Sequence, residues 1–247
     1  MNHATAHAAT RLSTSLQVDG LHAFYGRSHI LQGLTLCVEA GEVVALLGRN
    51  GSGKTTTFRA IVGLMPRTEG SVRLGDRALS GKSTHYIARS GVAYVPSGRR
   101  SFGQMTVKEN LRIAHEEHSK TRLSRALNDV LDLFPALHSK LNTRAGVLSG
   151  GENQMLKMAC AFLTNPSVLL LDEPTEGLAP LVVSELKEHI RTLATTGVGI
   201  LIAEQNARFA FGLSQRAYVL NKGFIQLSGS VDDLSANEQI LSHLGLG

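Results

Sequence analysis

The sequence is poor in the features that mark secreted and membrane-spanning proteins. It has no tryptophan and only two cysteines among 247 residues. No apolar run approaches the roughly 18 residues that a transmembrane helix needs, and the first residues, MNHATAHAATRLST, contain no continuous apolar segment of the signal-peptide type. We therefore expect a cytoplasmic protein in which residues 1–14 are a disordered N-terminus.

The two cysteines, Cys37 and Cys160, lie far apart and in apolar surroundings. This placement argues against a disulfide framework and against a cysteine-based metal site. We expect both thiols to be buried in the core, where cysteine behaves as a small hydrophobic residue.

The charge balance is mildly basic. Lysine and arginine number 25 against 20 aspartates and glutamates, which gives a net charge of +5. Such a balance suits an anionic partner, for example a nucleotide or lipid headgroups. The sequence has no lysine-rich tail and no basic run interleaved with aromatic residues, so we do not expect a nucleic-acid partner.

Short β-branched runs alternate with helical patterns, which favours an α/β fold with a largely parallel sheet. The run VLLLD is apolar throughout, as expected for a strand that is covered on both faces. The expected strands of this sheet span residues 42–48, 92–96, 167–172, 199–204 and 217–223.

Two further parts of the chain show different patterns. Residues 15–25 and 31–40 have the pattern of an antiparallel strand pair. Thr106 and Glu109 form a capping box at the start of a helix, and apolar residues at helical spacing follow over 123–134 and 150–163. We predict one domain, residues 15–247, with a helical insertion over about residues 97–165.

The segment GRNGSGKTTT, residues 48–57, follows an apolar strand and opens a helix. It matches the phosphate-loop pattern G-x-x-x-x-G-K-[ST]. Glycines let successive backbone N–H groups turn toward phosphate oxygens, and the helix N-terminus adds positive potential. In this pattern Lys54 bridges the β- and γ-phosphates, and the Thr55 hydroxyl binds Mg²⁺. The alternative, an ordinary glycine turn, is disfavoured by the strand and helix around the segment. The predicted nucleotide contacts are Gly48, Arg49, Asn50, Gly51, Ser52, Gly53, Lys54, Thr55 and Thr56.

The segment VLLLDEP, residues 168–174, places two carboxylates at the end of a neighbouring strand. We expect Asp172 to hold Mg²⁺ through water. Glu173 is expected to act as the general base toward the attacking water, a role worth about 10² to 10⁴ in rate. Taken alone, an acidic pair at a strand end is often a solvated edge. Together with a phosphate loop, it indicates nucleotide hydrolysis.

The segment LSGGENQ, residues 148–154, has two glycines behind a serine at the start of a predicted helix. Such a start forms an anion site, although this one has no metal ligand or base of its own, and alone it is equally consistent with a helix cap. Combined with the phosphate loop and the DEP segment, it makes the chain resemble the ATP-binding subunit of ABC transporters, whose signature reads L-S-G-G-Q. The positions are filled by Leu148, Ser149, Gly150, Gly151 and Glu152, with glutamate in place of the last glutamine.

The resemblance implies a P-loop NTPase core (ABC ATPase) with an N-terminal antiparallel β-subdomain and a helical subdomain inserted between phosphate loop and signature. In that family the signature caps the γ-phosphate of ATP that the phosphate loop of the opposite subunit holds. It therefore implies a second ABC ATPase subunit, in a homo- or heterodimer, and ATP and Mg²⁺ as ligands.

Three more positions take roles from the resemblance. Tyr25 falls where the family stacks an aromatic ring on adenine, worth about 1 to 3 kcal/mol by analogy with base stacking; the alternative is a core tyrosine. Ser97 stands where a glutamine senses Mg²⁺ and faces the membrane subunit, and serine reaches the metal only through a water. Gln205 replaces the switch histidine and can hydrogen-bond the γ-phosphate. The alternative is that Gln205 caps the next helix, although Asn206 is the better cap.

The segments VPSGRRSFGQMTVKENL, LSGGENQML, DEPTEGLAPLVV and AEQNARFAFGLSQRAYVLNKG resemble the second, shorter ATPase of branched-chain amino acid uptake systems (LivF-like). Gln205 agrees with the V-E-Q-N pattern of that group, and Ser97 departs from its V-P-E-G-R-R. The resemblance implies an ATPase peripheral to the inner face of the cell membrane. Its partners are permease subunits and, indirectly, a periplasmic or extracellular solute-binding protein.

Two alternatives stay open at this point. A non-transport ABC ATPase that maintains nucleic acid normally carries a long coiled coil between phosphate loop and signature, whereas here about ninety residues without sustained heptads intervene. A catalytically weak regulatory subunit would agree with Ser97 and Gln205. It would also agree with the loop after the acidic pair, which lacks the aspartate common in other ABC subunits. Glu173 argues against it.

Overall fold

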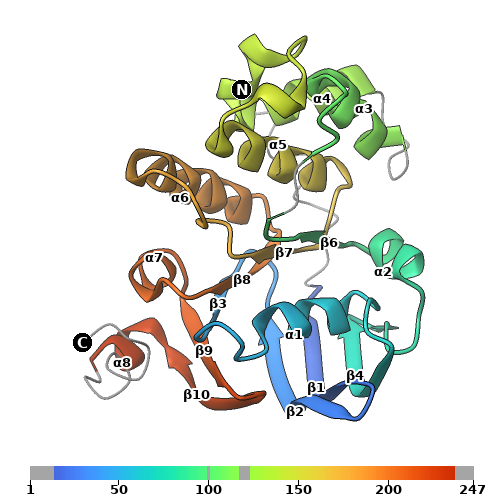
Figure 1. Ribbon diagram of the computed structural model, residues 1–247, viewed down its shortest axis with the longest axis vertical. Helices are drawn as coiled ribbons and strands as arrows, with labels where there is room; N and C mark the ends of the chain where they lie inside the picture. Colours follow the sequence, from blue (N-terminus) through green and yellow to red (C-terminus); the bar gives the residue numbers. More distant parts are fainter. Residues whose placement is uncertain (1–13, 99–100, 117–122, 237–247) are drawn as a thin grey trace.

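The computed structural model describes residues 14–98, 101–116 and 123–236. It contains a four-stranded sheet, a six-stranded sheet and helices around both. The four-stranded sheet and the helices of residues 107–163 lie at opposite ends of the molecule, with the six-stranded sheet between them (Figure 1). The disordered segment predicted over residues 1–14 lies outside the described residues, apart from Thr14.

The six-stranded sheet confirms the predicted α/β fold. Its strands are β3 (Val43–Leu47), β6 (Val92–Val95), β7 (Val168–Asp172), β8 (Gly199–Glu204), β9 (Arg216–Asn221) and β10 (Phe224–Ser230). The strand order is β10-β9-β3-β8-β7-β6, and all neighbours are parallel except β9 and β10. Every strand expected from the sequence is present, with ends close to the predicted ones.

The register of three neighbouring strands positions the candidate site. Leu47 at the end of β3 pairs with Glu204 at the end of β8, and Ala203 of β8 pairs with Asp172 at the end of β7. The carboxyl ends of these parallel strands therefore meet at one edge of the sheet. This edge is where ligands bind in open α/β sheets.

Alternate residues of β7 pack into two separate hydrophobic cores. Leu170 packs into the core shared with the four-stranded sheet, whereas Leu171 packs into the core shared with the helices of the insertion. All residues of β7 are buried. The prediction of a strand covered on both faces is confirmed.

The four-stranded antiparallel sheet contains the strand pair that the sequence predicts. Its strands are β1 (Leu16–Tyr25), β2 (Ser28–Val38), β4 (Arg67–Leu74) and β5 (Arg77–Ala78), in the order β2-β1-β4-β5. Helix α1 (Lys54–Ile61) connects the two sheets, because its fully buried Phe58 lies in the core that both share.

The described residues between β6 and β7 are mainly helical, as predicted. It contains α3 (Val107–Glu116), α4 (Leu123–Leu133) and α5 (Gly150–Leu163), with 3₁₀ turns at Pro135–Lys140 and Ala145–Val147. The predicted capping box is present: the backbone N–H of Thr106 donates to Glu109 at 2.7 Å, and that of Glu109 donates to the Thr106 hydroxyl at 3.2 Å. The other helices are α2 (Thr84–Ser90), α6 (Pro180–Thr195), α7 (Ala207–Phe211) and α8 (Val231–Ser235).

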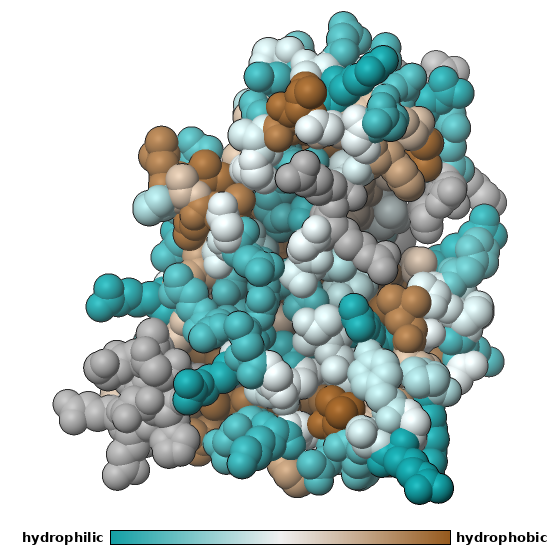
Figure 2. Space-filling view, viewed as in Figure 1, coloured by the Kyte–Doolittle hydropathy of each residue, from teal (hydrophilic) through white to brown (hydrophobic). Residues whose placement is uncertain are grey.

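On the face shown in Figure 2, hydrophobic residues form small separate patches among hydrophilic ones. Within the described ranges, none of the helices combines the length and the apolar character needed to cross a bilayer.

The prediction of a buried thiol is wrong for Cys37, which is free and partly exposed. Cys160 is also free; it packs against the core of the insertion with part of its surface exposed, and burial raises the pKa of its thiol. Cys37 lies on the edge strand β2, between two buried residues of an alternating pattern, and its Sγ donates to Glu39 at 3.1 Å. Cys160 lies on α5 and borders a surface groove.

Candidate functional site

The phosphate loop follows β3 and ends in α1, as the sequence predicts. Gly48 has to be glycine, because a Cβ there would collide with the Ser52 hydroxyl and with the carbonyl of Leu220. Gly53 precedes α1 with φ +116°, in the left-handed region that favours glycine. The two glycines of the pattern are thus needed for different reasons. Gly48 allows neighbouring atoms to approach closely, and Gly53 allows the turn into α1.

Lys54 is buried at the first position of α1, and its ammonium points back into the loop. Nζ donates to the carbonyl oxygens of Gly48 at 2.8 Å and Arg49 at 3.3 Å. It also forms an ion pair with Glu173 Oε1 at 3.0 Å. The predicted phosphate-binding lysine and the predicted base are therefore adjacent.

Asp172 and Thr55 also lie together. The Thr55 hydroxyl donates to Asp172 Oδ1 at 3.1 Å, and the Tyr94 hydroxyl donates to Oδ2 at 3.0 Å. Burial raises the pKa of Asp172, and the hydrogen bonds from Tyr94 and Thr55 oppose that shift. Burial likewise raises the pKa of Tyr94, and the Asp172 charge adds to the effect. The pair of oxygen ligands predicted for Mg²⁺ is thus assembled at the sheet edge.

Glu173 has a backbone conformation that is rare outside glycine. Its φ is +47°, in the left-handed region, which costs on the order of 1 kcal/mol or more for such a residue. Its backbone N–H is held by the Ala203 carbonyl at 2.9 Å, and its own carbonyl accepts from Glu176 at 3.1 Å. The turn directs the carboxylate toward Lys54, away from the strand direction.

The phosphate loop also contains polar groups without hydrogen-bond partners in the described part of the chain, and a bound phosphate would satisfy them. The Ser52 hydroxyl is buried and has no hydrogen-bond partner among the described residues, and such groups normally require one. The first N–H groups of α1 have no intrahelical acceptors and face the loop. A phosphate supplies the acceptors that these groups lack. Carboxylate and hydroxyl oxygens, as in Asp172 and Thr55, suit Mg²⁺.

Of the other predicted loop contacts, Arg49, Asn50 and Gly51 are exposed, and Thr56 is half-buried. Tyr25 is 42% exposed at the end of β1, so the alternative of a core tyrosine is wrong. Its hydroxyl accepts from Arg59 of α1 at 3.2 Å. This contact holds the ring beside the helix that the phosphate loop opens.

Gln205 follows β8 directly and has an exposed side chain. Its backbone N–H donates to Glu204 Oε2 at 3.1 Å. Asn206, not Gln205, is the N-cap of α7, accepting from Phe209 N–H at 3.1 Å. The alternative in which Gln205 serves as the cap is therefore wrong, and its side chain is free to contact a ligand at the sheet edge.

The signature segment begins α5 with a complete capping box. Glu152 N–H donates to the Ser149 hydroxyl at 3.2 Å, and Ser149 N–H donates to Glu152 Oε2 at 2.8 Å. Lys140 lies 3.2 Å from Glu152 Oε1. The pKa of Glu152 is lowered, chiefly by the bond from the Ser149 backbone. Glutamate at the last signature position therefore stabilises the helix start.

Helix α5 packs closely on α6 at the signature. A Cβ on Gly151 would collide with Val182 of α6. Gly150 and Gly151 keep first-turn N–H groups without intrahelical acceptors. These N–H groups remain available to an anion.

The signature and the phosphate loop lie on different sides of the acidic pair. A cavity of about 370 Å³ is bordered by Ser97, Ser149, Gly150, Glu173 and Glu176, among others, but by no phosphate-loop residue. Within the ranges that the structure describes, no hydrogen bond or ion pair connects Leu148–Glu152 to residues 48–56. The chain thus brings together the phosphate loop, acidic pair and Gln205 segment, while its signature shares a cavity with Glu173 but not with the phosphate loop.

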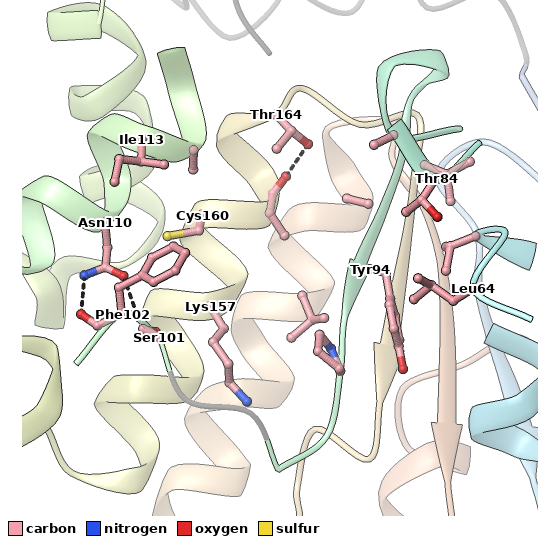
Figure 3. A pocket seen from close by; sticks show the side chains of 18 residues that line it. Leu64, Thr84, Tyr94, Ser101, Phe102, Asn110, Ile113, Lys157, Cys160 and Thr164 are labelled. Atoms are coloured by element: carbon pink, nitrogen blue, oxygen red, sulfur yellow. Dashed lines mark hydrogen bonds between the residues drawn. The ribbon is translucent and has the colours of Figure 1, made fainter. Parts of the chain in front are cut away.

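A second, larger cavity of about 530 Å³ forms a groove between β6 and the helices of the insertion. Its lining is mostly apolar and includes Tyr94, Pro96, Phe102 and Cys160 (Figure 3). Phe102 is 64% exposed there, while Asn110 holds its backbone by two hydrogen bonds of 2.9 and 3.1 Å.

Lys157 extends from α5 into the same groove (Figure 3). Burial lowers the pKa of Lys157, and the negative charge of Glu176 opposes that shift. Its ammonium makes no hydrogen bond or ion pair within the part of the chain that the structure describes.

Sequence reasoning missed three of these residues: Tyr94, Lys157 and Glu204. A tyrosine in an apolar strand and a lysine in an amphipathic helix have ordinary structural explanations. A glutamate that ends an apolar strand is the one signal that was available, because β8 is otherwise entirely apolar.

Comparisons with known proteins agree with this arrangement. Residues 31–176 match the family model described as ABC transporter. The high-affinity branched-chain amino acid transport ATP-binding protein BraG of Pseudomonas aeruginosa is 38% identical over 225 residues, which cover 91% of this chain and 97% of that protein. The lipopolysaccharide export system ATP-binding protein LptB of Escherichia coli is 34% identical over 222 residues, covering 88% and 91%.

A solved structure is similar over nearly the whole chain. It is an ATP-binding cassette of an ABC transporter in its ADP conformation, with a TM-score of 0.84 and 24% identity, covering 95% of this chain and 99% of that one. This similarity confirms the predicted fold.

Proposed function

The chain belongs to the ABC transporter family, and we propose that it is the ATP-hydrolysing subunit of an importer for branched-chain amino acids or related small polar solutes. Residues 15–247 form the ABC ATPase domain in this proposal, with the helical subdomain over about 97–165. The observation that carries it is the meeting of Lys54, Glu173, Thr55 and Asp172 at one sheet edge.

Each of these residues has its own role in the hydrolysis of ATP. Lys54 contacts the γ-phosphate and stabilises the charge that develops on it. Glu173 accepts the proton of the attacking water. Gln205 donates its amide to a γ-phosphate oxygen, and Tyr25 stacks on the adenine. Thr55 would hold Mg²⁺ directly, and Asp172 and Ser97 would hold it through water; the bound ion would offset phosphate charge.

The working unit is a head-to-tail dimer with a second ABC ATPase subunit. Support comes from the separation of the two segments within one chain: among the described residues, the cavity beside the signature has no phosphate-loop residue, and no hydrogen bond or ion pair joins the signature to the phosphate loop. The N–H groups of Gly150 and Gly151, with the Ser149 hydroxyl, suit the γ-phosphate of ATP bound to the opposite subunit. Glu152 lies in the same turn, and its charge is offset by Lys140.

The groove between β6 and α5 is the proposed contact for the permease. The groove begins at the end of β6, just before Ser97, whose loop faces the membrane subunit in this family. Apolar side chains such as Phe102 favour an apolar permease segment. The half-buried ammonium of Lys157 favours a segment that carries a carboxylate, because a buried charge is stabilised by a partner.

The proposed solute, a branched-chain amino acid or a related small polar molecule, is supported by one of the two relatives. BraG serves branched-chain amino acid transport, and Gln205 and the G-L-A-P segment agree with the uptake-type pattern. LptB serves lipopolysaccharide export, so export of an envelope lipid is the second candidate.

Two measurements test the function. A steady-state assay of the purified chain should show Mg²⁺-dependent release of phosphate from ATP. Cells that lack the chain should lose uptake of labelled leucine, isoleucine or valine and regain it on complementation. Normal uptake together with an envelope-export defect would replace the importer by the second candidate.

A further inference from the structure

Glu204, at the end of β8, has a side chain only 3% exposed and a carboxylate that accepts four hydrogen bonds. Oε1 accepts from the Thr175 hydroxyl at 2.6 Å and from the Thr175 backbone N–H at 3.2 Å. Oε2 accepts from the backbone N–H groups of Gln205 at 3.1 Å and Asn206 at 3.4 Å. One side chain thus joins the turn after the acidic pair to the segment of Gln205.

The backbone of Glu204 reaches the third part of the site. Its carbonyl accepts from the N–H of Gly48, the first glycine of the phosphate loop, at 3.3 Å. The phosphate loop, the acidic turn and the Gln205 segment therefore all bond to a single residue.

The chemistry of this position requires a carboxylate. Four N–H or O–H donors point at the two oxygens, which offer about four acceptor sites. An amide in the same place would turn its NH₂ group toward donors, whichever way it was flipped. Burial raises the pKa of Glu204, and the hydrogen bonds, beginning with that from Thr175, lower it.

The bonds to Thr175 bear directly on Glu173. Glu173 is two residues earlier in the same turn and has the strained φ of +47°. A strained residue keeps its conformation only where its surroundings fix it. The turn is fixed on one side by Ala203, which accepts from Glu173 N–H at 2.9 Å, and on the other by Glu204 through Thr175.

We propose that Glu204 is a positioning residue for hydrolysis, which holds the turn of Glu173 and the backbone of Gln205 in one geometry relative to the phosphate loop. This inference rests on the proposed function, because it requires that Glu173 and Gln205 act on the γ-phosphate. Glu204 contacts neither reacting atom itself. It should therefore affect the rate of the chemical step more than the affinity for ATP.

The test uses Thr175 and Glu204 in the full-length chain. Thr175→Val removes the hydroxyl donor with little change of shape, whereas Thr175→Ser keeps the donor and is the matched control. Glu204→Gln keeps the size of the side chain and places donors against donors. We expect kcat to fall about tenfold in Glu204→Gln and severalfold in Thr175→Val, since each loses a hydrogen bond to a charged group. Thr175→Ser should keep the wild-type rate, and the Kd for ATP should stay within about twofold throughout.

The double variant Glu204→Gln, Thr175→Val should be no slower than Glu204→Gln alone, because the two side chains act through one contact. The proposal is overturned if Thr175→Val leaves kcat unchanged, whether or not the melting temperature falls. It is also overturned if the two effects multiply. Failure of the proposed function is distinct from both results, since it appears as a wild-type chain without ATPase activity. If Glu204→Gln does not fold, the Thr175→Val and Thr175→Ser pair decides alone.

Discussion

The ammonium of Lys54 lies 3.0 Å from a carboxylate oxygen of Glu173, and their side chains are 4% and 22% exposed. The proposed phosphate-binding cation and the proposed base thus neutralise each other within one chain. In the proposed function, a γ-phosphate bound at the loop would compete with Glu173 for Lys54. We therefore expect ATP binding to free the Glu173 carboxylate, while Lys54 gains a phosphate partner.

Lys54→Ala should abolish turnover or lower it by at least about 10², because the γ-phosphate loses its main positive contact. The Glu173 carboxylate also loses its ion-pair partner. Steady-state phosphate release and binding of a fluorescent ATP analogue measure both effects. Turnover near the wild-type rate would rule out the site.

Glu173→Gln should bind ATP and stall. The amide keeps the size of the carboxylate but cannot accept the proton of water, which costs about 10² to 10⁴ in rate. A stable dimer of this variant should then accumulate in the presence of ATP, as seen by size-exclusion chromatography, with ADP as the negative control. Hydrolysis at the wild-type rate would place the base elsewhere.

Tyr94→Phe should raise the Mg²⁺ concentration needed for half-maximal ATPase activity. The change removes the hydroxyl that donates to Asp172 Oδ2 and keeps the ring that borders the groove. Asp172 then loses one of the two bonds that orient it. A titration of activity with Mg²⁺ at saturating ATP reads this shift, and binding of ATP without Mg²⁺ is the control. An unchanged Mg²⁺ titration would contradict the role given to Asp172 and Tyr94.

Gln205→Ala should lower turnover with little effect on ATP binding, because its amide contact matters most as charge develops on the phosphoryl group. Gln205→His should keep activity and become pH-dependent between about pH 6 and 7, where imidazole titrates. The rate relative to wild type should be higher at the acidic end, where the imidazolium adds positive charge. A lower melting temperature with an unchanged rate in Gln205→Ala would assign the residue a structural role only.

Lys157→Met should weaken capture of the permease from detergent-solubilised membranes, because it keeps the apolar stem of lysine and removes the charge. Lys157→Arg keeps the charge and should retain more of the capture. Quantitative mass spectrometry of tagged chain, expressed at equal levels, compares the three proteins. Equal recovery of the permease with the wild-type, methionine and arginine proteins would contradict the proposal that the permease segment carries a carboxylate.

The sequence patterns located most of the sheet, because hydrophobic periodicity is local and β7 and β8 are apolar throughout. They also located α5 and the capping box of Thr106 and Glu109, since such a box depends on residues three positions apart. At Ser149 they indicate only a helix cap, and the capping box with Glu152 is found in the structure. They missed β4, RTEGSVRL, because it is mostly polar, has only two buried residues and is fixed by its pairing with β1.

The candidate site follows the same division. The phosphate loop and the acidic pair are contiguous motifs, so their chemistry can be predicted from the sequence without knowledge of the structure. The hydrogen bonds from Thr175 to Glu204 and from Tyr94 to Asp172 join residues 29 and 78 positions apart. No local pattern predicts such contacts. For Cys37, a local pattern predicts burial wrongly. Its apolar neighbours in sequence lie on the opposite face of the strand, so their burial says nothing about Cys37.

In the proposed dimer, the signature of one chain completes the ATP site of another. Specific ATPase activity, measured over a dilution series together with sedimentation, tests this arrangement most directly. We predict that activity per chain falls as dilution converts dimers to monomers. Constant activity per chain in samples that sediment as monomers would contradict it.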